Sequence, residues 1–135
     1  MIYLTKRVHF CASHRLHSPE FSDEENRRIY GACNNPRGHG HNYVLDVTLA
    51  GTPDPRTGMI MDLKEIGRVV RERIVDEVDH RHLNHDVPWL AGVIPTVENL
   101  IREFWRALEA ALPPGTLHEL RLWETETSWA VYRGE

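Results

Sequence analysis

Three residues that commonly bind transition metals lie close together in the segment CNNPRGHGHNY, residues 33–43. Cys33 is one of two cysteines in the chain, and His39 and His41 follow it at alternate positions. In an extended strand, side chains two residues apart point to the same side, so both imidazoles can face one ion. Cys33 could be a further metal ligand, a structural thiol, or a reactive group beside a metal that other residues hold.

A third histidine ends another segment that the sequence predicts to be a strand. Residues 2–14 alternate apolar and polar side chains, with one interruption at Lys6, and His14 ends the apolar side. If this strand pairs antiparallel with a second predicted strand, residues 39–50, the three histidines converge. Three neutral imidazoles suit Zn²⁺ and leave a fourth position open, as in catalytic zinc sites. Ordinary hydrogen-bonded histidines are the alternative, and a closed site with Cys33 would indicate a structural metal.

The rest of the sequence predicts the helices and strands that pack against these two strands. Residues 17–37 are polar and predict a long loop, and Asp62 with Glu65 resembles a capping box that opens a first helix. A second helix follows Pro95 and Thr96, and two more strands end the chain. The order β–β–α–α–β–β predicts an α+β domain over residues 1–135, with a four-stranded antiparallel sheet and both helices on one face. The other face is then free to pack on a partner subunit.

Composition excludes several classes of protein. The chain has 135 residues, enough for one domain, and a net charge of −4 argues against a general nucleic-acid binder. No apolar run is long enough to cross a bilayer, and the first residues do not have the layout of a signal peptide. Two cysteines do not form a disulfide framework. We therefore expect a cytoplasmic protein with free thiols and no membrane or nucleic-acid partner.

Six segments, in order and spread over nearly the whole chain, resemble the 6-pyruvoyltetrahydropterin synthase family. They are FCASHRL, DEENRRIYGACNNPRGHGHNY, DPRTGMIMDL, VDHRHLNHDVP, PTVENL and WETETSWAVYRGE. The combination of FxASH with CNNPxGHGHNY is far more specific than an isolated HxH. The related 6-carboxytetrahydropterin synthases commonly have a shorter gap between the cysteine and HGH, so this gap favours the pyruvoyl type.

The resemblance implies the tunnelling fold, assembled as a homohexamer of two trimeric barrels with active sites at subunit interfaces. It implies zinc on three histidines and a catalytic thiol outside the coordination shell. The thiol acts as general base together with an Asp-His pair. By position in the motifs, the zinc ligands are His14, His39 and His41, and the catalytic residues are Cys33, Asp79 and His80.

The resemblance also implies a pterin pocket. Glu124 matches an acidic residue that anchors the pterin ring, which implies a catalytic and a substrate-binding role for it. Thr96 and Glu98 match residues near the ring. Glu124 shares a predicted strand face with Leu120, where a carboxylate without a partner is costly, so a pterin or a nearby arginine must pair with it. Val97 stands where the pyruvoyl enzymes often have a second threonine.

The reaction that the resemblance implies is a zinc-dependent elimination. Its substrate is the small molecule 7,8-dihydroneopterin triphosphate, converted to 6-pyruvoyltetrahydropterin with release of triphosphate in tetrahydrobiopterin biosynthesis. The alternative in the family is 6-carboxytetrahydropterin synthase of queuosine biosynthesis, which takes the same substrate and releases acetaldehyde and triphosphate. Neither reaction needs an external redox cofactor.

Two other classes of function remain as competing hypotheses. A metallohydrolase of the β-lactamase type has its Asp-His directly after HxH, whereas Asp79 lies far beyond His41 in this chain. A non-catalytic metal- or pterin-binding protein on the same fold is expected to lack the thiol or the Asp-His pair. This chain has both, so a catalytic protein is favoured.

Overall fold

A five-stranded sheet forms the frame of the computed structural model, which describes residues 1–135. The strand order is β3-β1-β2-β4-β5, and the four long strands pair antiparallel while β3 pairs parallel with β1. The strands are β1 (Ile2–His14), β2 (His39–Gly51), β3 (Arg81–His82), β4 (Leu117–Thr125) and β5 (Ser128–Tyr132).

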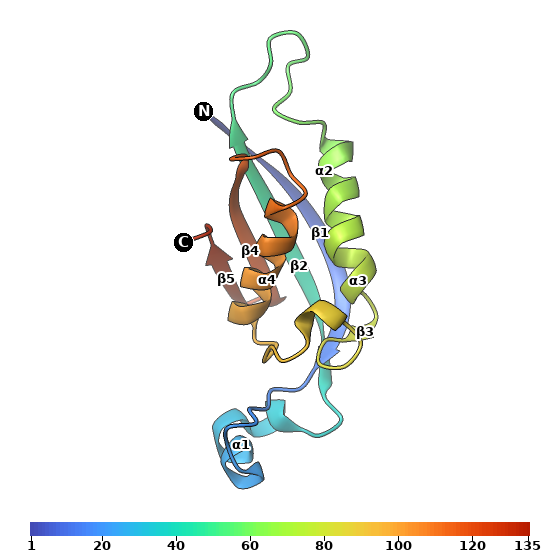
Figure 1. Ribbon diagram of the computed structural model, residues 1–135, viewed down its shortest axis with the longest axis vertical. Helices are drawn as coiled ribbons and strands as arrows, with labels where there is room; N and C mark the ends of the chain where they lie inside the picture. Colours follow the sequence, from blue (N-terminus) through green and yellow to red (C-terminus); the bar gives the residue numbers. More distant parts are fainter.

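Two helical segments, side by side, cover one face of this sheet (Figure 1). The first runs without a break through α2 (Leu63–Val70), a π-helical turn (Arg71–Val75) and α3 (Asp76–Val78), and it packs on β1. The second is α4 (Val97–Glu109), which packs on β4 and β5. The buried side chains of β1 and β2 alternate with more accessible ones, as the period-two pattern predicted. No helix is both long and apolar enough to span a membrane.

The pairing of β1 with β2 is continuous over their whole length. Ile2 is opposite Gly51 at one end and His14 is opposite His39 at the other. The core-facing positions of both strands therefore lie side by side, and Phe10 stacks on Tyr43 with ring centroids 4.8 Å apart. The predicted strand 2–14 and its antiparallel pairing with the second strand are confirmed.

The prediction of a four-stranded antiparallel sheet with only two helices is wrong in detail. The sheet is mixed, because the two residues of β3 add a parallel fifth strand, and two residues are too short to produce a period-two pattern. The predicted loop 17–37 contains α1 (Asp23–Tyr30) and a 3₁₀ turn (Gly31–Asn34); another 3₁₀ turn spans Pro88–Leu90. The α+β class is correct.

The helix caps differ from the prediction in an instructive way. Asp62 caps α2 by accepting from the backbone N–H of Lys64, but Glu65 turns away to bind Arg68, so the reciprocal half of the box is missing. The complete capping box belongs to α1, where Ser22 and Glu25 each accept from the other's backbone N–H. The polar composition of α1 hides this helix, because α1 presents no apolar stripe.

Asn26 holds the α1 segment together, beyond the ends of β1 and β2 (Figure 1). It is fully buried, its Oδ1 accepts from the backbone N–H of Ser18 at 2.7 Å, and its Nδ2 donates to the carbonyl of Ser18 at 2.9 Å. The same amide donates to the carbonyls of Phe21 and Ser22. One side chain thus closes the loop between β1 and α1.

We expect Asn26→Ala to destabilise this segment while the sheet stays folded. Removing the amide leaves buried backbone groups of Ser18 without partners, which costs about 1–3 kcal/mol. Hydrogen exchange by mass spectrometry should show faster exchange over α1 and unchanged exchange in β2. The matched control is Asn35→Ala, which removes an exposed side chain with weak hydrogen bonds. Equal exchange over α1 in Asn26→Ala and wild type would contradict the assigned role.

Candidate metal centre and active site

Three imidazoles meet where β1 ends and β2 begins. The ring centroids of His14, His39 and His41 lie 4.8 to 5.0 Å apart. One nitrogen of each ring lies within 4.8 Å of the others, a cluster that could hold a metal ion. The β1–β2 register produces this arrangement, because His14 is opposite His39 and Ala12 is opposite His41. The predicted convergence of the three histidines is confirmed.

The hydrogen bond of His14 to a carbonyl directs the lone pair of its other ring nitrogen toward the cluster. His14 Nδ1 lies 2.8 Å from the carbonyl oxygen of Pro95, and because a carbonyl only accepts, Nδ1 carries the proton. His14 Nε2 is then unprotonated and lies 3.2 Å from His39 Nε2. His41 Nε2 is buried and has no hydrogen-bond partner. An orphaned buried nitrogen of this kind needs a ligand.

Burial keeps two of the imidazoles, those of His14 and His41, neutral. His14 is 1% exposed, and loss of solvation lowers its pKa to about 4. Burial also lowers the pKa of His41, partly opposed by the nearby carboxylate of Glu124. At neutral pH both rings therefore have a free lone pair, the state in which histidine binds a metal.

Three imidazole nitrogens are a donor set that suits zinc, and His14 and His39 have the spacing of two ligands of one ion. Metal–nitrogen distances of about 2.0–2.1 Å place tetrahedral ligands about 3.3–3.4 Å apart, close to the 3.2 Å between His14 and His39. The carbonyl of Pro95 orients His14 as outer-shell partners orient metal-bound histidines. Glu124 Oε1 lies 3.8 Å from His41 Nε2, so a carboxylate borders the cluster. The three candidate ligand atoms come from histidines alone, and neither cysteine belongs to the set.

Cys33 is tied to the residues that directly follow His14. Its carbonyl accepts from the backbone N–H of Leu16 at 2.9 Å, and the carbonyl of Asn34 accepts from Arg15 Nε at 2.9 Å. Asn34 is buried and its amide donates to the carbonyl of Leu16 at 2.7 Å. The backbone of Cys33 is therefore tied to Leu16, two residues after His14 of the cluster. The thiol of Cys33 is free and half-buried.

Asp79 and His80 form a pair on the free edge of β1. Asp79 Oδ1 accepts from the backbone N–H of Cys11 at 2.9 Å, and Asp79 Oδ2 lies 2.9 Å from His80 Nδ1. The Cys11 hydrogen bond, followed by the contact with His80, lowers the pKa of the Asp79 carboxyl. His80 has φ of 60°, a costly conformation for this residue type, and its side chain is 80% exposed. No hydrogen bond links this pair to Cys33 within the chain.

The residues expected near a pterin lie at the start of α4. Thr96 is the N-cap, and its hydroxyl accepts from the backbone N–H of Asn99 at 3.2 Å. It directly follows Pro95, whose carbonyl holds His14. Glu98 is exposed in the first turn, and Val97 packs against the core. Thr96 therefore has a structural role as the cap of α4. Val97, which stands where the family often has a second threonine, packs against the core instead.

The structure adds two residues to this region that the motifs did not identify as site residues. Gly38 has φ of 76°, and a Cβ there would lie 2.8 Å from the carbonyl oxygen of His14 and 2.9 Å from His82 Nε2. His82 stacks on His85 with ring centroids 4.4 Å apart. The turn before His39 therefore depends on glycine. Gly38 stands in an NPRG turn, which is the only signal in the sequence that could have indicated it.

Comparison with known proteins gives a consistent match along the chain. The family model described as 6-pyruvoyl tetrahydropterin synthase matches residues 3–135. The human 6-pyruvoyl tetrahydrobiopterin synthase is 45% identical, over 98% of this chain and 91% of the human one. The Poecilia reticulata protein of the same name is 47% identical, over 98% of this chain and 90% of that one.

A solved structure agrees with these sequence matches. The Caenorhabditis elegans 6-pyruvoyl tetrahydropterin synthase superposes with a TM-score of 0.95 at 36% identity, and the match covers 99% of this chain and 96% of the other. The family model, the relatives and the fold agree over nearly the full length. This chain belongs to the 6-pyruvoyl tetrahydropterin synthase family.

Proposed function

We propose that this protein is a zinc-dependent lyase that converts 7,8-dihydroneopterin triphosphate to 6-pyruvoyltetrahydropterin and releases inorganic triphosphate. The single observation that carries the proposal is the cluster of three converging histidines in a member of this family. The orphaned nitrogen of His41 supports a bound metal, and the three-nitrogen donor set supports zinc. Free thiols are consistent with a cytoplasmic protein.

In this proposal the metal and the thiol have separate tasks. His14, His39 and His41 would hold zinc, which when bound polarises the side-chain oxygens of the substrate and acidifies the neighbouring C–H. Cys33 would take the proton from that carbon. A thiol has an ordinary pKa near 8.5, and nearby positive charge favours the thiolate. Cys33 can act as base only if it is not itself a ligand.

Asp79 and His80 would complete the proton path. The carboxylate of Asp79, held by the Cys11 N–H, stays ionised and binds His80 at Nδ1. His80 Nδ1 is then the protonated nitrogen, and the exposed Nε2 is free to exchange a proton with substrate or thiol. Asp79 stabilises the protonated imidazole and fixes its orientation, as carboxylates do in other catalytic pairs.

Three further residues would bind the substrate. Glu124 lies beside His41, which favours a contact with the reacting side chain as well as the pterin N–H groups that the resemblance implies. Thr96 and Glu98 follow Pro95 at the start of α4, so they would approach the pterin from the side of His14. A carboxylate can accept two adjacent pterin N–H groups together.

We further propose that the active site is completed in a homohexamer. No hydrogen bond joins Cys33 to His80 within one chain, and the imidazole of His80 is largely exposed. The sheet also ends in two edges, β5 and most of β1, that lack a neighbouring strand. Open edges of this kind favour pairing with other copies of the chain.

The decisive experiment is the identity of the product. Purified, zinc-loaded protein incubated with 7,8-dihydroneopterin triphosphate should release triphosphate and give 6-pyruvoyltetrahydropterin, detected by mass spectrometry. The control omits protein. A carboxylated pterin together with acetaldehyde would contradict the pyruvoyl assignment and indicate 6-carboxytetrahydropterin synthase.

The metal assignment predicts that His41→Ala loses zinc. Two imidazoles and water bind the ion far more weakly than three, so zinc should fall from about one ion per chain towards zero. Plasma mass spectrometry of dialysed protein measures the content. His85→Ala is the matched control, because His85 is exposed and outside the cluster. Retention of zinc in His41→Ala would refute this ligand assignment.

The role of Cys33 predicts that Cys33→Ala keeps its zinc and loses turnover. Removing a general base typically lowers the rate by about 10²–10⁴-fold. Cys11→Ala, which removes the other free thiol, is expected to keep both zinc and activity. Loss of zinc from Cys33→Ala would make Cys33 a ligand, and unchanged turnover would exclude it as the base.

A further inference from the structure

The chain that leaves β1 has no neighbouring strand on the side of β2, because the pairing of the two strands ends at His14 and His39. Arg15 is the first residue beyond this pairing, so its backbone N–H and carbonyl need other partners. Asn84 provides both. Asn84 Oδ1 accepts from the backbone N–H of Arg15 at 2.8 Å, and Asn84 Nδ2 donates to the carbonyl of Arg15 at 2.8 Å. One side-chain amide thus takes the place of a backbone amide here.

Asn84 belongs to the loop that begins with Asp79 and His80. In this loop β3 pairs parallel with β1, and the backbone N–H of Leu83 donates to the carbonyl of Ser13 at 2.8 Å. The amide of Asn84 adds a further attachment two residues along the same chain. The loop is therefore fastened to β1 as far as the strand extends and one residue beyond the histidine that ends it.

Arg15 connects Asn84 with the segment that carries the thiol. Arg15 Nε donates to the carbonyl of Asn34 at 2.9 Å, directly after Cys33. The backbone N–H of Leu16 donates to the carbonyl of Cys33 at 2.9 Å, and the buried amide of Asn34 donates to the carbonyl of Leu16 at 2.7 Å. Two consecutive carbonyls, those of Cys33 and Asn34, are thus held by two consecutive residues after the metal cluster.

The position of the thiol relative to the three histidines depends on these hydrogen bonds. Cys33 reaches His14 only through Leu16 and Arg15, and the backbone of Arg15 is held by Asn84. A proton acceptor that is displaced by about 1 Å from its reacting atom can lose about 10²-fold in rate. A general base on a loop therefore needs attachments of this kind.

We propose that Asn84 is a positioning residue for the thiol of Cys33. It fixes the backbone of Arg15, and Arg15 in turn fixes the carbonyl that follows the thiol. The proposal rests on the proposed function, in which Cys33 is the general base. Asn84 is assigned no contact with substrate or metal, so it should affect the chemical step and leave substrate binding and zinc content unchanged.

Steady-state kinetics of zinc-loaded Asn84→Ala test this separation. We expect kcat for 7,8-dihydroneopterin triphosphate to fall by about 10–100-fold, with KM and zinc content unchanged. His85→Ala, which changes an exposed residue of the same loop, should leave kcat unchanged. A merely structural role would lower the melting temperature and leave kcat of the folded protein at the wild-type value, and that result would overturn the proposal.

A double-mutant cycle shows whether Asn84 acts through Cys33. In the Cys33→Ala background, Asn84→Ala should cause no further loss of turnover, because the group that it positions is already absent. An equal fold-loss in both backgrounds would overturn the proposal. The cycle is repeated with Asn84→Asp, which keeps the acceptor for the Arg15 N–H and loses the donor to its carbonyl, so that the test holds even where Asn84→Ala does not fold.

Alkylation of Cys33 measures the placement of the thiol without any turnover. Iodoacetamide should react with Cys33 several-fold faster in Asn84→Ala than in wild type, because a half-buried thiol on a loosened loop becomes more accessible. Cys11, the second free thiol, is the internal control and should react at the same rate in both proteins. Equal rates at Cys33 would overturn the proposal. Faster alkylation in a protein whose wild type turns over no pterin would contradict the proposed function alone.

Discussion

The register between β1 and β2 is the constraint on which the site depends. It places His14 opposite His39 and Ala12 opposite His41, so that three rings from two strands meet at one end of the sheet. A slip of one residue would turn His39 and His41 to the opposite face, away from His14. The stacked rings of Phe10 and Tyr43 and the buried leucines of β2 resist such a slip, because it would also expose them. The core that stabilises the fold therefore also fixes the positions of the three histidines.

Much of this arrangement could be predicted, because it follows from alternation along strands. The sequence shows that His14, His39 and His41 lie on the apolar sides of their strands. One antiparallel pairing of the two strands then brings the three side chains together. The contacts that orient the cluster could not be predicted in the same way. The carbonyl of Pro95 that binds His14 lies 81 residues away in the chain and belongs to the start of α4. Only the packing of that helix on the sheet brings the two together.

Two polar features were missed for a related reason. The α1 segment is ordered by the buried amide of Asn26, and the Cys33 segment by that of Asn34, and neither leaves an apolar periodicity. Each asparagine orders its segment without a hydrophobic core, because its amide forms hydrogen bonds with backbone groups that would otherwise be buried without a partner. Sequence patterns detect apolar faces far better than they detect single amides of this kind. A long polar segment with buried asparagines is consequently easy to mistake for an unstructured loop.

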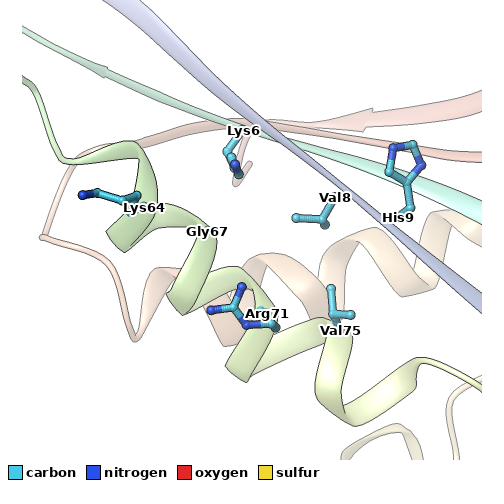
Figure 2. Close-up of a pocket in the computed structure, with 7 residues that line it drawn as sticks. All are labelled: Lys6, Val8, His9, Lys64, Gly67, Arg71 and Val75. Atoms are coloured by element: carbon cyan, nitrogen blue, oxygen red, sulfur yellow. The ribbon is translucent and has the colours of Figure 1, made fainter.

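The core-facing side of β1 combines three environments along one strand. His14 is desolvated and neutral, Phe10 is packed in the core, and Lys6 lies half-buried beside a helix that has no side chain at Gly67 (Figure 2). Such a gradient is unfavourable for a strand selected for stability alone, since leucine or valine at position 6 would bury more apolar area. The histidine has a clear reason in the cluster that could hold a metal ion. Lys6 is the exception on this face, because no carboxylate of the same chain pairs with its ammonium, and the missing side chain at Gly67 leaves room for it.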